Sequence, residues 1–289
     1  MGNGRGSQRG AGTPATAPVT LPAPRTAEAV PARGPALLPD RVLRRRGRWW
    51  EELLVVALGY WLYGLVRNGV PTHEAAALSR ALSVYRVEGW LHVDVELAVN
   101  KAVASVHWLA VTANYYYATL HFVVTLGVLL WLYVRHPRRY RPVRSVLYLA
   151  SLVGLVGFWV FPLAPPRMLP SLGYIDTVVV FHTWGSWASG DVANASNQFA
   201  AMPSLHLAWA LWCGIALVRL SPHQSVKVLG AVYPVLTFAV ILATANHFVV
   251  DAVGGAVVLG IGFGLQRLLT GRAAFAGVPA PATVPASRA

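Results

Sequence analysis

The sequence predicts an all-α, polytopic membrane protein: a bundle of six transmembrane helices with an additional amphipathic helix segment at the interface. Of its 289 residues, 55% are hydrophobic and 12% are charged, and the mean hydropathy is +0.50. An ordinary soluble domain is about a quarter charged. A chain this apolar has too little polar surface to cover a globule in water, so we expect it to lie in a membrane.

The middle of the chain differs in composition from both ends. Residues 1–48 and 271–289 are rich in Gly, Pro and Ala, and such segments cannot bury enough surface to offset their ordering entropy. We therefore expect disordered tails there, the first of them basic, and a six-span domain over residues 49–270. The predicted spans are 50–66, 115–134, 146–161, 206–220, 228–245 and 249–269.

The segment 73–108 follows another pattern. Apolar residues recur every three or four positions, with charged residues between them. This periodicity predicts one or two amphipathic helices lying in the membrane interface. A helix packed on the outer face of the bundle would show the same pattern, so both interpretations stay open.

Basic residues are distributed unevenly over the predicted loops. With six spans, 19 of the 24 lysines and arginines fall on the side of the two tails and 5 on the other side. The positive-inside rule then predicts a multi-pass protein of the cell membrane with both termini in the cytoplasm. Because these residues lie beside span ends, we expect membrane lipids as partners and no nucleic acid. The single cysteine, Cys213, excludes a disulfide framework and a CxxC zinc site.

Polar residues gather in three segments on the opposite, extracytoplasmic side. These segments are FPLAPPR at 161–167, PSLH at 203–206 and NHFVVD at 246–251. Only 41 residues separate His206 from His247. A helical span takes about 20 residues, so two spans return the chain to the same face of the membrane. The spacing therefore predicts one shared site.

His247 and Asp251 are four residues apart, which places them on one helix face roughly 6 Å from each other. A carboxylate that accepts a hydrogen bond from one imidazole nitrogen fixes the tautomer and leaves the other nitrogen as nucleophile or base. Ionisable groups at the start of a span usually serve a function. A pair that only pins two helices together is the structural alternative.

The other two segments carry groups suited to phosphate. Pro203 fits the first turn of a helix, which would leave the backbone N–H groups of Ser204 and Leu205 free to bind an anion. The Ser204 hydroxyl adds a donor, and His206 could protonate a leaving oxygen. Arg167, presented by a proline-rich loop, could clamp a phosphate. A plain helix start and a lipid-anchoring arginine are the alternatives.

PSLH followed one helical hairpin later by HxxxD resembles the type 2 phosphatidic acid phosphatase superfamily over roughly residues 50–270. The chain is most similar to the branch that contains inositol phosphorylceramide synthase. This resemblance implies a lipid phosphatase or phosphotransferase, inositolphosphotransferase-like, with a lipid phosphate as substrate and neither cofactor nor metal. It also implies that His247 forms a phosphohistidine, that Asp251 orients it, and that His206 protonates the leaving alkoxide and then activates the acceptor.

The resemblance further implies that Ser204 and backbone N–H groups hold the phosphate oxygens, and we add Arg167 and Asn246 to the predicted phosphate-binding set. The chain departs from the commoner family pattern at three places. The Lys-x6-Arg-Pro segment before the serine motif has no counterpart, because Arg141-Pro142 lies on the predicted cytoplasmic side and Val134 stands at the lysine position. Leu205 replaces the usual glycine between serine and histidine, and residues 240–241 are Val-Ile where the pattern has Ser-Arg. Arg167 is therefore the candidate for the missing phosphate cation.

Other functions stay open on the residues alone. His206, His247 and Asp251 could bind zinc or iron in a metal-dependent intramembrane hydrolase. Ser204 and His247 could form a rhomboid-like serine hydrolase, and a non-catalytic membrane scaffold is the remaining alternative. Within the phosphoryl-transfer interpretation, segments 73–108 and 168–202 could cover the site and exclude water, which would favour transfer over hydrolysis.

Overall fold

A computed structural model of the protein describes residues 1–2, 48–68, 74–183 and 198–276. Most of the two predicted tails, and residues 184–197 of the predicted cover, lie outside the described residues. Within the described part, the regular structure consists of helices, with one isolated bridge between Leu163 and Ala200 and no strand. The predicted all-α class is confirmed for this part of the chain.

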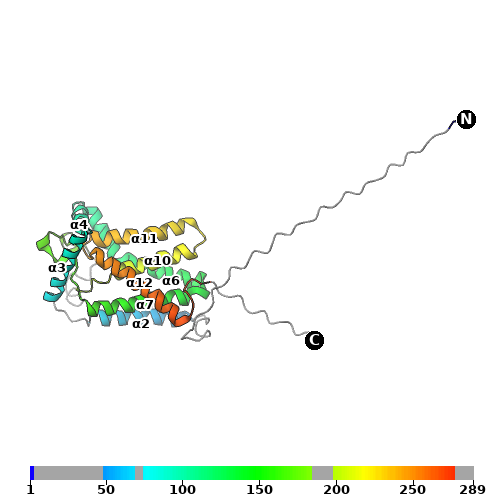
Figure 1. Ribbon diagram of the computed structural model, residues 1–289, viewed down its shortest axis with the longest axis horizontal. Helices are drawn as coiled ribbons and strands as arrows, with labels where there is room; N and C mark the ends of the chain where they lie inside the picture. The colour runs from blue at the N-terminus through cyan, green and yellow to red at the C-terminus, as the bar shows by residue number, and fades with distance from the viewer. Residues whose placement is uncertain (3–47, 69–73, 184–197, 277–289) are drawn as a thin grey trace. The chain divides into compact units, whose positions relative to one another are not determined.

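Every predicted span corresponds to a helix or a continuous helical stretch (Figure 1). The long elements are α2 (Trp49–Asn68), α6 (His121–Arg135), α7 (Pro137–Val160), α10 (Leu205–Leu220), α11 (Gln224–Ala243) and α12 (Val249–Thr270). The shorter elements are α3 (Glu74–Leu91), α4 (Glu96–Ala104), α5 (His107–Tyr115), η1 (Tyr116–Leu120), η2 (Pro166–Met168), η3 (Pro170–Leu172) and α8 (Thr177–Val180).

Four of these stretches are long and apolar enough to cross a membrane. They are His107–Arg135, which joins α5, η1 and α6, then Pro137–Val160, Gln224–Ala243 and Val249–Thr270. Helix α10 is apolar but has only 16 residues, and α2 carries Glu51 and Glu52 in its first turn. The protein is thus a helical membrane protein, whereas the predicted number of six spans is not confirmed.

The predicted amphipathic segment forms α3 and α4, which lie at one end of the bundle (Figure 1). Both helices are packed against the remainder of the protein, because Glu88 of α3 and Glu96 and Asn100 of α4 are fully buried. The Asn100 side chain donates to the carbonyl oxygens of Ile175 and Ala243 at 3.0 and 2.9 Å. These contacts favour the interpretation of helices packed on the outer face of the bundle.

Helix α12 packs closely against its neighbours at glycine positions. A Cβ at Gly255 would lie 2.3 Å from the Ser204 carbonyl oxygen, and one at Gly262 would lie 2.9 Å from the Val146 carbonyl oxygen. Without side chains at these two positions, the helix backbones can approach one another. The crossing at Gly255 fixes the start of α10, and therefore His206, against the first turns of α12.

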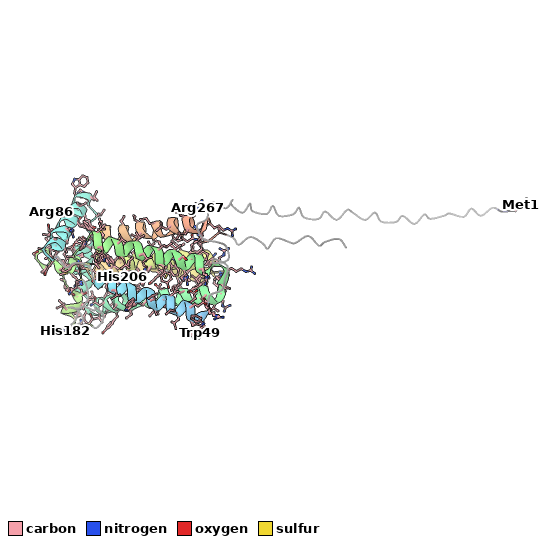
Figure 2. All side chains as sticks on the ribbon, turned by 90° about the horizontal axis from the view of Figure 1, so that it is seen from below. Met1, Trp49, Arg86, His182, His206 and Arg267 are labelled. Atoms are coloured by element: carbon pink, nitrogen blue, oxygen red, sulfur yellow. The ribbon has the colours of Figure 1, made fainter. Side chains whose placement is uncertain are left out.

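The two ends of the bundle carry different residues. Trp49 and Arg267 lie at one end and Arg86 and His182 at the other (Figure 2). At the Trp49 end, Glu52 forms an ion pair with Arg144 and lies 3.8 Å from Arg141. The chain thus enters α2 and leaves α12 at the same end, which is compatible with an even number of passes along the bundle.

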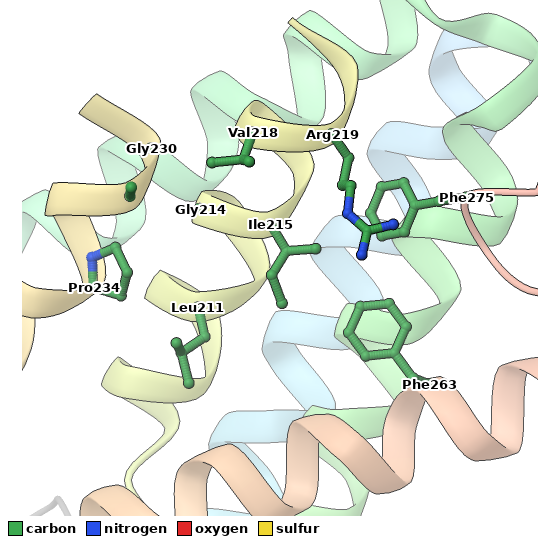
Figure 3. Close-up of a pocket in the computed structure, with 10 residues that line it drawn as sticks. Leu211, Gly214, Ile215, Val218, Arg219, Gly230, Pro234, Phe263 and Phe275 are labelled. Carbon is green, nitrogen blue, oxygen red and sulfur yellow. The ribbon is translucent and has the colours of Figure 1, made fainter. Parts of the chain in front are cut away.

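A groove of about 450 Å³ opens between α10, α11 and α12 (Figure 3). Its walls run along α10 from Leu211 to Arg219, and Phe275 lies at its edge. The Arg139 guanidinium donates to the Phe275 carbonyl oxygen at 3.0 Å, so residues just beyond the predicted domain end at 270 still pack on the bundle. The groove does not include His206 and is distinct from the predicted site.

Candidate active site

The structure brings His206 and His247 together at the end of the bundle that carries α3 and α4. His206 is the second residue of α10, and His247 lies in the short connection between α11 and α12. Their ring centroids are 5.7 Å apart. The Ser204 N–H donates to the Asp251 carbonyl oxygen at 2.8 Å, which ties the start of α10 to the first turn of α12. Two segments 41 residues apart thus form one cluster.

His247 and Asp251 form a buried pair. The Nδ1 atom of His247 lies 3.4 Å from Asp251 Oδ2, and the same carboxylate oxygen accepts the Phe248 N–H at 2.9 Å. Both side chains are almost fully buried, and His247 Nε2 has no hydrogen-bond partner among the described residues. With the proton on Nδ1, directed at Asp251, the lone pair of Nε2 is available for nucleophilic attack.

The turn that presents His247 has an unusual backbone. Ala245 has a φ of +49°, in the left-handed region that non-glycine residues rarely adopt. Its N–H donates to the Leu242 carbonyl, and the Asn246 N–H donates to the Ile241 carbonyl, so both groups close the C-terminus of α11. Strained residues held by buried contacts are common at functional sites, and Ala245 is fully buried.

Arg167 is held next to this turn. The prolines before it end the helical path of α7, and Arg167 lies in the 3₁₀ turn η2. Its backbone N–H donates to Ala245 O at 2.9 Å, and its Nε donates to Asn246 Oδ1 at 2.9 Å. Its Nη1 lies 3.4 Å from Asp176 Oδ2. The predicted cation therefore lies beside the residue that precedes His247, and a bound anion would compete with Asp176 for it.

Ser204 occupies the N-cap of α10 and is fully buried. Its hydroxyl accepts the Leu207 N–H at 3.5 Å. Its own N–H is donated to Asp251, so the prediction that this N–H is free for an anion is wrong. The reason is the close crossing of α10 and α12, which the sequence does not indicate. The role of the Ser204 hydroxyl in phosphate binding stays a prediction.

Two aromatic side chains of the cluster are absent from the sequence prediction. Tyr117 stacks on His206 with ring centroids 4.2 Å apart, and the ring of His121 meets His206 edge-on at 4.3 Å. Both come from η1 and the start of α6, where one turn of π-helix interrupts the long helix. Such turns are frequent at functional sites. A histidine inside an apolar span was the available signal for His121.

Metal binding finds no support in the described residues. Among them, no group of three or more His, Cys, Asp or Glu side chains is arranged to hold a metal ion. Within the set of His206, His247 and Asp251, Nδ1 of His247 lies 3.4 Å from Asp251 Oδ2.

Comparison with known proteins identifies a family. A family model described as the PAP2 superfamily matches residues 82–265, which is more than half of the chain and runs from within α3 through most of α12. Neither the curated proteins nor the solved structures contain a significant match. The matched region contains all six residues of the predicted site.

Proposed function

Because the chain belongs to the PAP2 superfamily, we propose that it cleaves a lipid-linked phosphate at the extracytoplasmic face of the cell membrane, with both termini in the cytoplasm. Family membership itself indicates a membrane enzyme of the phosphatase type. The observation that best supports the mechanism is the buried His247, whose Nδ1 lies 3.4 Å from Asp251 while Nε2 has no partner among the described residues.

In the first half-reaction, Nε2 of His247 attacks the phosphorus atom. An N–P bond forms while the P–O bond to the lipid alkoxide breaks, and the alkoxide takes a proton from His206. The ring separation of 5.7 Å leaves His206 close to the reacting group. Asp251 stabilises the positive charge that develops on the imidazole. Arg167, Asn246 and Ser204 are the candidates that hold the phosphate oxygens.

In the second half-reaction, His206 removes a proton from the acceptor hydroxyl, whose oxygen attacks phosphorus while the N–P bond breaks. Water as acceptor gives hydrolysis, and an alcohol gives transfer. We favour transfer of an inositolphosphoryl type, in which a phosphodiester donor leaves its headgroup phosphate on His247. The PSLH and PPR segments support this branch, and so does the packing of α3 and α4 over the end of the bundle that holds the site.

The test is the formation of a phosphoenzyme by the full chain in lipid nanodiscs. A donor lipid labelled in its phosphate should label the parent protein, and vanadate should inhibit turnover, because it mimics the pentacoordinate transition state. His247→Ala should take up no label and lose at least about 10⁴-fold in rate. His206→Ala should lose about 10² to 10⁴-fold, as for removal of a general acid. Chelators should leave the rate unchanged.

His223→Ala is the matched control, because this histidine is exposed and caps α11 at the opposite end of the bundle. It should label like the parent. Label that persists in His247→Ala would refute the phosphohistidine. Product analysis with and without a lipid alcohol separates the two acceptors. If the phosphodiester donor yields only headgroup phosphate released to water, in an amount that added alcohol does not alter, transfer would be excluded.

A further inference from the structure

A pair of buried carboxyl groups lies above the first turn of α12. Glu88 comes from α3 and Glu96 from α4, and both residues are fully buried. Neither forms an ion pair with a lysine or arginine among the described residues. Burial of an ionised carboxylate without a partner is very unfavourable. The reaction steps proposed above do not use either residue, so their burial requires another explanation.

The hydrogen bonds connect this pair with the candidate nucleophile. Glu88 Oε1 accepts the backbone N–H of Val250 at 2.6 Å, and Glu96 Oε1 accepts the Tyr174 hydroxyl at 3.0 Å. Val250 lies between His247 and Asp251, in the first turn of α12. The N-terminus of α12 therefore has two carboxylate acceptors. Asp251, from α12 itself, accepts the Phe248 N–H, and Glu88, from α3, accepts the Val250 N–H.

The surroundings of Glu88 favour its protonated form. The titratable groups that face it are Glu96 of α4, Asp251 of α12 and Tyr174 of the loop before α8, and all of them are acids. The pKa of Glu88 is raised to about 8: burial is the largest cause, the Val250 hydrogen bond opposes it, and the carboxyl groups of Glu96 and Asp251 add to the rise.

Each of the two carboxyl groups has one oxygen without a hydrogen-bond partner among the described residues. These oxygens are the buried Oε2 atoms of Glu88 and Glu96. Two ionised carboxylates cannot donate to each other, whereas a protonated carboxyl is a donor as well as an acceptor. A proton on Glu88 would let its carboxyl donate a hydrogen bond to the side chain of Glu96. The Tyr174 hydroxyl donates to the same Glu96 side chain, at Oε1.

We propose that Glu88 is a positioning residue for His247: it shares a proton with Glu96 and holds the first turn of α12 without placing another negative charge beside Asp251. This inference rests on the proposed role of His247. Loss of the proton would add negative charge next to Asp251 and to the site that receives the phosphate. Activity should therefore decline above about pH 8, mainly through a rise in KM.

The direct test is infrared spectroscopy of the full chain in nanodiscs. The parent at pH 7 should show the C=O stretching band of a buried protonated carboxyl, and this band should disappear as the pH rises through about 8. Glu88→Gln should lack the band, while it keeps an oxygen that accepts the Val250 N–H. Glu74→Gln, an exposed position on the same helix, is the matched control and should keep the band.

Stability and turnover supply two further measurements. Between pH 4.5 and about 8, the folded protein keeps a proton that the unfolded chain has released, so the Tm of the parent should fall as pH rises across this window. In Glu88→Gln, this part of the decline should be absent. The variant should also retain parent kcat at pH 7 and lose the decline in activity above pH 8, an effect that a merely structural role would not produce.

The outcomes separate the two proposals. If the band is missing in the parent, or persists in Glu88→Gln, the shared proton is refuted even where His247 takes up label. If Glu88→Gln keeps the parent's alkaline decline in activity, its positioning role is refuted. If the band behaves as expected but the parent never forms a phosphoenzyme, the proposed function fails while the protonated pair stands.

Discussion

Replacing Gly255 by alanine adds a methyl group where α12 crosses the start of α10. The new Cβ would lie 2.3 Å from the Ser204 carbonyl oxygen and 3.3 Å from its carbonyl carbon. The first distance is more than 1 Å shorter than an ordinary contact of 3.4 Å. Both neighbours are backbone atoms, so neither can rotate away. The two helices must therefore separate by about 1 Å at this level.

Separation at this crossing acts directly on the candidate site. It stretches the 2.8 Å hydrogen bond from the Ser204 N–H to Asp251 and moves His206 relative to His247. A misplacement of about 1 Å can cost a reaction about 100-fold in rate. Overpacking also destabilises by about 1–3 kcal/mol. We expect Gly255→Ala to fold with a lower Tm and to lose about 100-fold in kcat, with a smaller change in KM.

Gly260→Ala is the matched control on the same helix, because an added Cβ there meets nothing within 4 Å. Alanine is favoured over glycine in a helix by about 1 kcal/mol, so this variant should keep parent kcat and an equal or higher Tm. Steady-state kinetics and thermal unfolding of both purified variants provide the comparison. Parent kcat in Gly255→Ala, or an equal loss in both variants, would refute the argument that this crossing positions the two histidines.

Two further substitutions probe the surroundings of the site. Arg167→Gln removes the cation held beside the nucleophile and should raise KM for the lipid phosphate about 10–100-fold, as loss of a charge-assisted contact predicts, whereas the exposed Arg86→Gln should change KM little. Equal KM values in the two variants would argue against a phosphate clamp. Tyr117→Leu removes the ring stacked on His206 and should lower kcat about 10-fold, since aromatic pairs contribute about 0.5–1.5 kcal/mol. Tyr115→Leu, half-exposed in the same segment, should match the parent, and parent kcat in both would exclude a role for the stacking.

Hydropathy locates the long helices but not their ends. The third predicted span begins at residue 146, whereas α7 begins at Pro137. Pro137 suits the first position of a helix, and the arginines that follow lower the hydropathy without preventing helix formation. Within this extension, Tyr140 and Val143 are buried, and Arg144 pairs with Glu52 of α2. Because the first third of α7 is rich in arginine, a prediction based on apolar runs places the start of this helix too late.

The cluster of His206, His247 and Asp251 followed from local spacing and from the length of a membrane span. The spacing of four residues places His247 and Asp251 on the same face at the start of one helix. Two spans of about 20 residues then return the chain from His206 to the same face of the membrane. Neither argument requires knowledge of how the helices rotate against each other, which is why the sequence sufficed to predict one shared site, in which the structure places the two rings 5.7 Å apart.

The sequence by itself thus determined the helical membrane class and the meeting of its two site histidines, because both depend on composition and on distance along the chain. The tertiary structure alone placed Tyr117 against His206, gave the Ser204 N–H to Asp251, and set Glu88 over the first turn of α12. Those contacts depend on how each helix is rotated and how closely it approaches its neighbour. In this protein, backbone contact at glycines such as Gly255 sets that approach, and a local pattern of residue types carries no information about it.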